Sequence, residues 1–142
     1  MKSKTLLPLL ALGLTLCLTG CSREFDVDNG TGTGSNTGAA TATTGSATPD
    51  YVSARCYLSA TAPSSAPLTD AGICCCKGYG TPTTSNLSVP LRSRGIDVNG
   101  KTSVSDYVIV GVIERNTTYS YRAYAVNSHG TAYGATKTFT TK

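Results

Sequence analysis

The sequence predicts an all-β protein with a single antiparallel β-sandwich, preceded by a signal peptide and a flexible tether. No window shows helical periodicity, because Gly, Pro, Thr and Ser interrupt every long segment. Short stretches of alternating apolar and polar residues occur instead, which is the pattern of strands with one buried face. Turn sequences separate them, and residues 40–142 have the length of one sandwich with one core, about 100 residues.

The first 20 residues have the form of a secretory signal peptide. Lys2 and Lys4 make a short basic start, and an apolar run of 13 residues follows from Leu6 to Leu18. This run is too short to cross a bilayer comfortably, because a spanning helix needs about 20 apolar residues. Residues 1–20 are therefore expected to be a signal that is removed from the mature protein.

The four residues that end at Cys21, "LTGC", resemble the lipobox of bacterial lipoproteins. The resemblance implies that the chain is cut just before Cys21 and that this residue carries diacylglycerol and an N-acyl chain such as palmitate. Each buried CH₂ contributes about 0.8 kcal/mol, so two or more chains anchor a protein stably. The implied partner is the outer membrane, reached through the lipid on Cys21, with no other cofactor. The alternative is an ordinary signal cut nearby, which leaves Cys21 a free thiol.

Residues 21–39 are expected to be the lipidated N-terminus and a flexible linker. Glu24, Asp26 and Asp28 resemble the export tag that sends some lipoproteins of Gram-negative gut anaerobes to the cell surface. The resemblance implies a surface-exposed protein of the outer membrane. Gly, Thr, Ser, Asn and Ala then dominate the chain, and such a composition buries too little apolar surface to offset the entropy of ordering.

Seven stretches with strand character follow, and they make up the predicted domain, residues 40–142. In chain order they cover residues 40–44, 51–60, 70–78, 86–93, 105–113, 118–127 and 135–141. The second stretch sets Val52, Cys56 and Leu58 on one face and Arg55 and Tyr57 on the other. The fourth contains Pro90, which confines it to the edge of a sheet. "TPTTSN", "VNGK" and "NSHGTAYG" are the turn sequences between later strands.

The C-terminal part of the chain carries a more specific pattern. It consists of Thr-x-Tyr, Arg-Ala-Tyr-Ala-x-Asn, Gly-x-x-Tyr-Gly and Phe-Thr-Thr, which begin at Thr117, Arg122, Gly130 and Phe139. The pattern resembles fibronectin type III-like domains of bacterial surface lipoproteins, and it implies that fold. The chain departs from the usual pattern of these domains at Cys75, Cys76, Arg115 and Lys137.

Four tyrosines lie close together in this part of the chain. The resemblance identifies Tyr119 as a tyrosine corner, with its hydroxyl bonded to the backbone just upstream. Tyr121 shares the inward face, at a place where an immunoglobulin domain has a disulfide cysteine, and the chain lacks the Trp of such domains. Tyr124 is expected on the outward face beside Arg122, with Tyr133 near the last turn. Arg122, Tyr124 and Tyr133 are therefore the candidate surface binding residues, and a cross-strand surface contact is the alternative.

Four cysteines remain besides Cys21 and the signal peptide, namely Cys56, Cys74, Cys75 and Cys76. They are interpreted as buried thiols that act as small hydrophobic side chains. A disulfide from Cys56 to the triplet, with Cys75 as the candidate, is the alternative in an exported protein. No metal site is predicted, because adjacent residues of a strand point to opposite faces and the only His lies far along the chain.

No catalytic residues are predicted. The Asp and Glu residues are scattered, and no pair has a spacing that indicates shared acid–base chemistry. Nucleic-acid binding is also disfavoured. Without Lys2 and Lys4, ten basic residues face eight acidic ones, and Arg92 and Arg94 are the only close basic pair after the signal peptide.

These features lead to three hypotheses about function. The first is a lipid-anchored, non-enzymatic protein of the cell envelope, whose sandwich is a binding or spacer module with a protein or glycan partner. The second is a structural subunit of an envelope or pilus-like assembly that donates or accepts a strand. The third is a cysteine-dependent redox or metal-binding protein, which depends on the "CCCK" sequence alone.

Overall fold

The computed structural model describes residues 38–142. The predicted signal peptide, Cys21, the acidic stretch and the linker up to residue 37 lie outside the described residues. Within the described part of the chain, no helix is long and apolar enough to cross a membrane.

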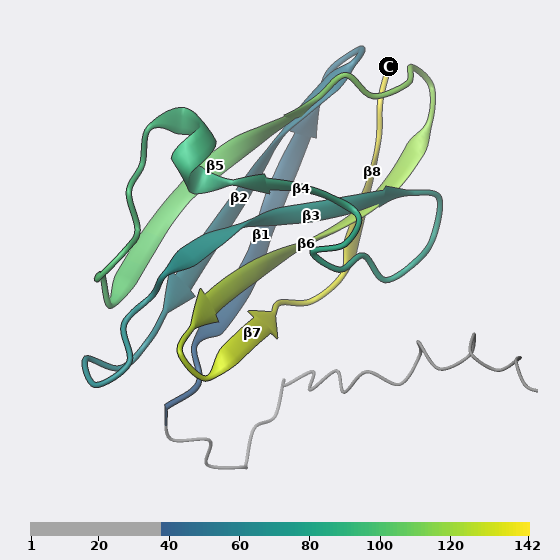
Figure 1. The fold of residues 1–142 in the computed structure, drawn as a ribbon. Helices are drawn as coiled ribbons and strands as arrows, with labels where there is room; N and C mark the ends of the chain where they lie inside the picture. Colours follow the sequence, from purple (N-terminus) through teal and green to yellow (C-terminus); the bar gives the residue numbers. More distant parts are fainter. Residues whose placement is uncertain (1–37) are drawn as a thin grey trace, which may run out of the picture.

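The chain forms a sandwich of two antiparallel sheets (Figure 1). The first sheet has the order β1-β2-β5, with the bounds Thr41–Pro49, Ser53–Thr61 and Ser103–Gly111. The second has the order β4-β3-β6-β7, with the bounds Leu87–Pro90, Asp70–Lys77, Thr118–Asn127 and Gly130–Tyr133. Both β7 and β8 (Lys137–Thr140) pair with β6, and a short 3-10 helix, η2 (Leu91–Arg94), follows β4. The predicted all-β fold, a single antiparallel β-sandwich, is confirmed, with Pro90 in an edge strand.

Alternation of side chains along the strands builds the core between the sheets. The inward residues of β2 are Ala54, Cys56, Leu58 and Ala60, and all four are buried. The inward residues of β6 are Tyr119, Tyr121, Ala123 and Ala125, which are buried as well. Both inward faces agree with the prediction from the sequence. Val52 was expected to join the first of them, but it is 50% exposed because it lies in the turn before β2.

The predicted tyrosine corner is present at the start of β6. The backbone N–H of Glu114 donates a hydrogen bond to Tyr119 Oη at 2.9 Å. The Tyr119 ring stacks on Phe139 with 5.7 Å between the ring centroids. Thr141 Oγ1 donates to the carbonyl oxygen of Glu114 at 2.6 Å. The connection between β5 and β6 is therefore held by side chains from both β6 and the C-terminal end.

β1 is joined to both sheets, although its sequence has little strand character beyond the threonines. It pairs with β2, with an irregularity in register just after Thr44. At this point the N–H of Ala123 in β6 donates to Thr44 Oγ1 at 2.9 Å, and Tyr121 Oη donates to the carbonyl of Gly45 at 2.9 Å. Gly134, between β7 and β8, makes the approach possible, because a Cβ there would lie 2.6 Å from Thr44 Oγ1.

Candidate functional site

The three predicted surface residues, Arg122, Tyr124 and Tyr133, lie close together but do not form an exposed surface. Arg122 is 5% exposed and Tyr124 is 3% exposed. The Arg122 guanidinium lies 3.9 Å from the centroid of the Tyr133 ring, and its Nε donates to the carbonyl of Pro82 at 2.6 Å. The prediction that Arg122 and Tyr124 face solvent is wrong, because other parts of the chain, among them the segment 78–86, cover this face of β6.

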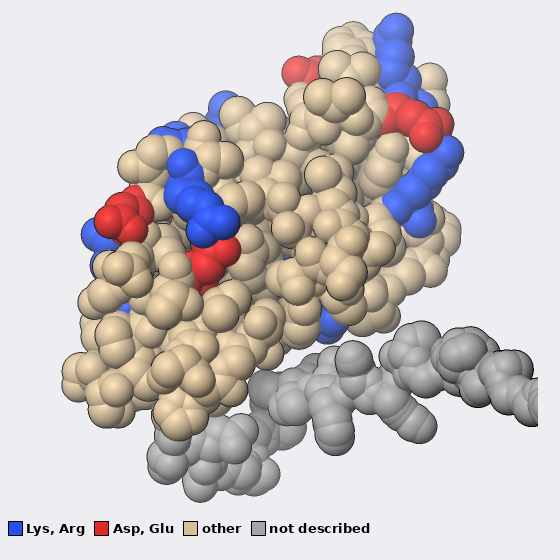
Figure 2. Space-filling model, viewed as in Figure 1, with Lys and Arg blue, Asp and Glu red and all other residues tan. Residues whose placement is uncertain are grey.

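The segment 78–86 connects β3 to β4, and hydrogen bonds hold it against the second sheet. Ser120 Oγ donates to the carbonyl of Gly78 at 2.7 Å, and the N–H of Thr84 donates to Tyr133 Oη at 3.1 Å. Figure 2 shows this side of the molecule, where charged side chains gather toward the ends and the middle is largely uncharged. The cluster of Arg122 and Tyr133 therefore holds a loop in place.

Tyr124 lies on the same covered face, against Gly72 of β3. A Cβ at Gly72 would collide with the carbonyl oxygen of Val89 in β4 and would lie 2.9 Å from Tyr124 Oη, so glycine leaves room for both. The hydroxyl donates to Asp70 Oδ2 over a long 3.4 Å. Burial, and next the Asp70 carboxylate, raise the pKa of Tyr124. These contacts make Tyr124 a packing residue.

The four cysteines of the domain, Cys56, Cys74, Cys75 and Cys76, are free thiols in the structure. Cys56 in β2 and Cys75 in β3 both belong to the core, whereas Cys74 Sγ lies 3.6 Å from the carbonyl oxygen of Pro82. Burial is the main cause that raises the pKa of the Cys56 and Cys75 thiols to about 12 and that of Cys74 to about 11. These three thiols stay protonated at neutral pH and pack as small apolar groups. A disulfide between Cys56 and Cys75 stays a prediction.

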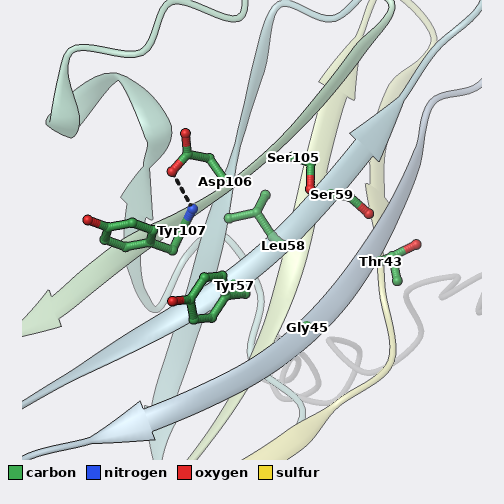
Figure 3. Close-up of a pocket in the computed structure, with 8 residues that line it drawn as sticks. All are labelled: Thr43, Gly45, Tyr57, Leu58, Ser59, Ser105, Asp106 and Tyr107. Carbon is green, nitrogen blue, oxygen red and sulfur yellow. Dashed lines mark hydrogen bonds between the residues drawn. The ribbon is translucent and has the colours of Figure 1, made fainter.

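The outer face of the first sheet carries a shallow hollow of about 430 Å³ (Figure 3). Two rows of residues run across the sheet there. The first row places Thr43, Ser59 and Ser105 opposite one another on β1, β2 and β5. The second places Tyr57 opposite Tyr107, with 5.4 Å between the ring centroids and 51° between the ring planes. A row of hydroxyl groups therefore lies beside a pair of aromatic rings.

Gly45 lies at the β1 end of the aromatic row. A Cβ at Gly45 would lie 2.8 Å from Tyr57 Cβ, so only glycine allows β1 to lie this close to Tyr57. The carbonyl of the same glycine accepts the Tyr121 hydroxyl on the core side of the sheet. Gly45 therefore contacts Tyr57 at the hollow and Tyr121 in the core.

Charged groups flank the hollow at β5. Arg94 Nη1 donates to Asp106 Oδ1 at 2.7 Å, and Arg94 Nη2 donates to Tyr107 Oη at 3.1 Å. The same guanidinium lies 3.8 Å from the centroid of the Tyr107 ring, and the Arg55 guanidinium lies 4.8 Å from it. Asp106 Oδ1 also accepts the Tyr107 N–H at 2.8 Å, whereas Oδ2 accepts no hydrogen bond from residues 38–142. Asp106 lies opposite the inward residue Leu58, so its carboxylate lies at the edge of β5 and points away from Tyr57 and the hydroxyl row (Figure 3).

Sequence reasoning placed Tyr57 on the outward face of its strand but did not identify the hollow. Alternation gives the face of Tyr57, yet the row requires the register of β2 against β5, which joins residues about 50 positions apart. Among the residues described, no group of three or more His, Cys, Asp and Glu side chains is arranged to hold a metal ion. The hollow is therefore the candidate functional site that the structure offers.

The comparisons with known proteins give fold neighbours only. No family model matches the chain, and no curated protein matches its sequence. A redesigned β-sandwich protein is similar in structure with a TM-score of 0.39 and 18% identity, over 70% of this chain and 88% of that one. The FN1–FN3 domains of chicken CNTN1 are similar with a TM-score of 0.41 and 13% identity, over 72% of this chain and 31% of that one. Both TM-scores are low, so the sandwich assignment follows from the strand order of this chain itself.

Proposed function

We propose that the protein is a lipid-anchored protein of the cell envelope, held at the outer membrane, whose fibronectin type III-like sandwich is a non-enzymatic binding or spacer module. The "LTGC" sequence that ends at Cys21 supports the lipid anchor. Glu24, Asp26 and Asp28 support a position at the cell surface. The low apolar content of the linker supports a tether that holds the sandwich away from the membrane.

The chemistry of the domain supports binding over catalysis. Cys56, Cys74 and Cys75 have raised pKa values, so they are poor nucleophiles at neutral pH. Every buried side-chain nitrogen and oxygen of the described residues has a hydrogen-bond partner, so the interior holds no polar group that awaits a substrate. The open hollow on the first sheet is the surface that supports a binding role.

The alternative of a strand-donating subunit has less support. β1 is the strand that would be exchanged, and it has nine residues that pair with β2 of the same domain. Its Thr44 and Gly45 also bond to β6. Donation of β1 to another molecule would break all of these contacts, which favours a module that folds by itself.

The anchor is tested by replacing Cys21. We expect Cys21→Ser to abolish acylation, so that the protein loses metabolic labelling with palmitate and leaves the outer-membrane fraction or stays uncleaved. The matched control is Cys17→Ser, which removes a nearby cysteine of the signal peptide and should keep both labelling and fractionation. If the Cys21→Ser protein is still processed, lipid-labelled and found with outer membranes, the lipid anchor is refuted.

A further inference from the structure

We propose that the hollow on the first sheet binds a neutral oligosaccharide of hexopyranose units, with one sugar ring packed on the Tyr57 side chain. This inference rests on the proposed function of a non-enzymatic binding module and names its ligand class. Two observations support it: an aromatic ring that is open to solvent, and a row of free hydroxyl groups beside it (Figure 3).

The open ring belongs to Tyr57. Tyr57 is 38% exposed, whereas the neighbouring Tyr107 ring has the guanidinium groups of Arg94 and Arg55 against it. A hexopyranose has an apolar side made of C–H groups, and such a side packs on an aromatic ring, which offers a large rigid apolar area. The open face of Tyr57 is therefore the position for a sugar ring.

The hydroxyl row supplies partners for the rim of the sugar. The side-chain hydroxyls of Thr43, Ser59 and Ser105 make no hydrogen bond to residues within 38–142, so each keeps one donor and two acceptor positions free. Tyr57 and Ser59 are two residues apart on one strand, which separates the rows by about 7 Å. This spacing lets a sugar on the ring, or the next sugar of the chain, reach the row.

The lining of the hollow has no charged side chain on its outward face. Asp106 lies opposite the inward residue Leu58, and its Oδ1 is held at the edge of β5 by Arg94 and by the Tyr107 N–H. No basic residue belongs to the described residues that line the hollow, so the hollow offers no counter-charge to an acidic ligand and favours a neutral one.

The architecture of the hollow agrees with binding of a chain. The hollow is shallow, and the rows run across three strands of an open sheet face. Small-ligand sites are usually enclosed clefts, whereas this site is shallow and open along the sheet. A linear oligosaccharide fits such a surface better than a small enclosed molecule.

The test uses the full chain, solubilised in detergent, in calorimetric titrations with cellohexaose, maltohexaose and mannohexaose, and with hexagalacturonate as the acidic probe. At least one neutral hexasaccharide should bind with a millimolar or lower Kd. Tyr57→Ala should weaken this binding at least tenfold, while Tyr57→Phe, which keeps the ring, should stay within threefold. Tyr79→Ala is the matched control, since Tyr79 is 84% exposed in the segment between β3 and β4, and it should bind as the unchanged protein does.

Several outcomes would overturn the proposal. They are the absence of binding to all three neutral hexasaccharides, binding of hexagalacturonate alone, and equal binding by the Tyr57→Ala protein. Circular dichroism of each variant shows whether the sandwich is folded, and Tyr57→Phe separates a lost contact from a lost fold. Membrane fractionation of the Tyr57→Ala protein should be unchanged, so a failure here is distinct from a failure of the lipid anchor.

Discussion

Tyr119 and Tyr124 point to opposite faces of β6, yet both are buried, at 6% and 3% exposure. Tyr119 belongs to the core between the sheets and to the corner at Glu114. Tyr124 packs against Gly72 on the outer face of the same sheet. The alternation of residues predicted the face of each tyrosine, but it contains no information about what covers an outer face.

We expect Tyr119→Phe to lower the free energy of unfolding by about 1–3 kcal/mol, because the Glu114 N–H then loses its acceptor in a partly buried place. We expect Tyr124→Ala to lower it by about 3–5 kcal/mol, because the loss of a buried aromatic side chain leaves a cavity. Urea titrations followed by circular dichroism measure both. The exposed control Tyr79→Ala should change stability by less than about 0.5 kcal/mol. A Tyr124→Ala protein as stable as this control would contradict the burial of Tyr124.

At the scale of elements, the sequence predicted the long strands best. β2 and β6 alternate, so their inward faces follow from the pattern, whereas the apolar run in β5 predicts a strand without deciding its face. The C-terminal end was harder to predict. β7 and β8 both pair with β6, and Gly134 between them lies against β1. Gly134 and Thr44 are 90 positions apart in sequence, so no local periodicity predicts their contact.

The contact of β1 with β6 gives a prediction for Thr44. Thr44→Val keeps the shape of the side chain but removes the acceptor of the Ala123 N–H, so the free energy of unfolding should fall by about 1–3 kcal/mol. Thr43→Val is the matched control, because Thr43 is the preceding residue of the same strand and is exposed. Its effect should stay within about 0.5 kcal/mol. Equal effects of the two substitutions in guanidinium chloride titrations would show that β1 does not depend on this bond.

At the scale of the molecule, size and pattern were sufficient to predict one sandwich. Cys56, Cys74 and Cys75 are buried as predicted, whereas Cys76 is only partly buried. The candidate site was not predictable in the same way. Alternation places Arg122 and Tyr124 on the outer face of β6. Residues from other segments, among them Pro82, then cover that face, and the sequence pattern does not show this. The hollow near Tyr57 arises from the pairing of three strands, so it exists only after the sheet has formed.

Two buried thiols and a buried phenol should make the domain less stable at alkaline pH. Cys56 and Cys75 have pKa values raised from 9.0 to about 12, and that of Tyr121 is raised from 10.0 to about 12, mainly by burial. Between pH 9 and 12 the unfolded chain releases protons that the folded chain keeps, so the unfolded state binds fewer protons and stability falls as pH rises. Below about pH 9 these groups are protonated in both states, and their contribution is fully present and constant.

Urea titrations at pH 8.0, 9.5 and 10.5 in a reducing buffer measure this effect. We expect the free energy of unfolding to fall over this series, and Cys56→Ala to reduce the slope by up to about 1.4 kcal/mol per pH unit. Val108→Ala is the matched control, because it removes core volume without removing a proton, and it should lower stability equally at each pH. A stability that stays constant up to pH 10.5 would mean that the thiols ionise in the folded protein.

The position of β1 also determines how the domain responds to traction. The chain enters the sandwich at Thr41, and the C-terminal residue Lys142 is bound at the opposite end of β1, where its N–H donates to the Asp50 carbonyl at 3.1 Å (Figure 1). A pull on the N-terminal side against a load at the far end therefore acts along the axis of β1. The hydrogen bonds between β1 and β2 lie perpendicular to this axis, so they are sheared together and do not open one after another. The bonds of Thr44 and Gly45 to β6 add to this resistance, so the domain should unfold only at a higher force when it is pulled from these two ends.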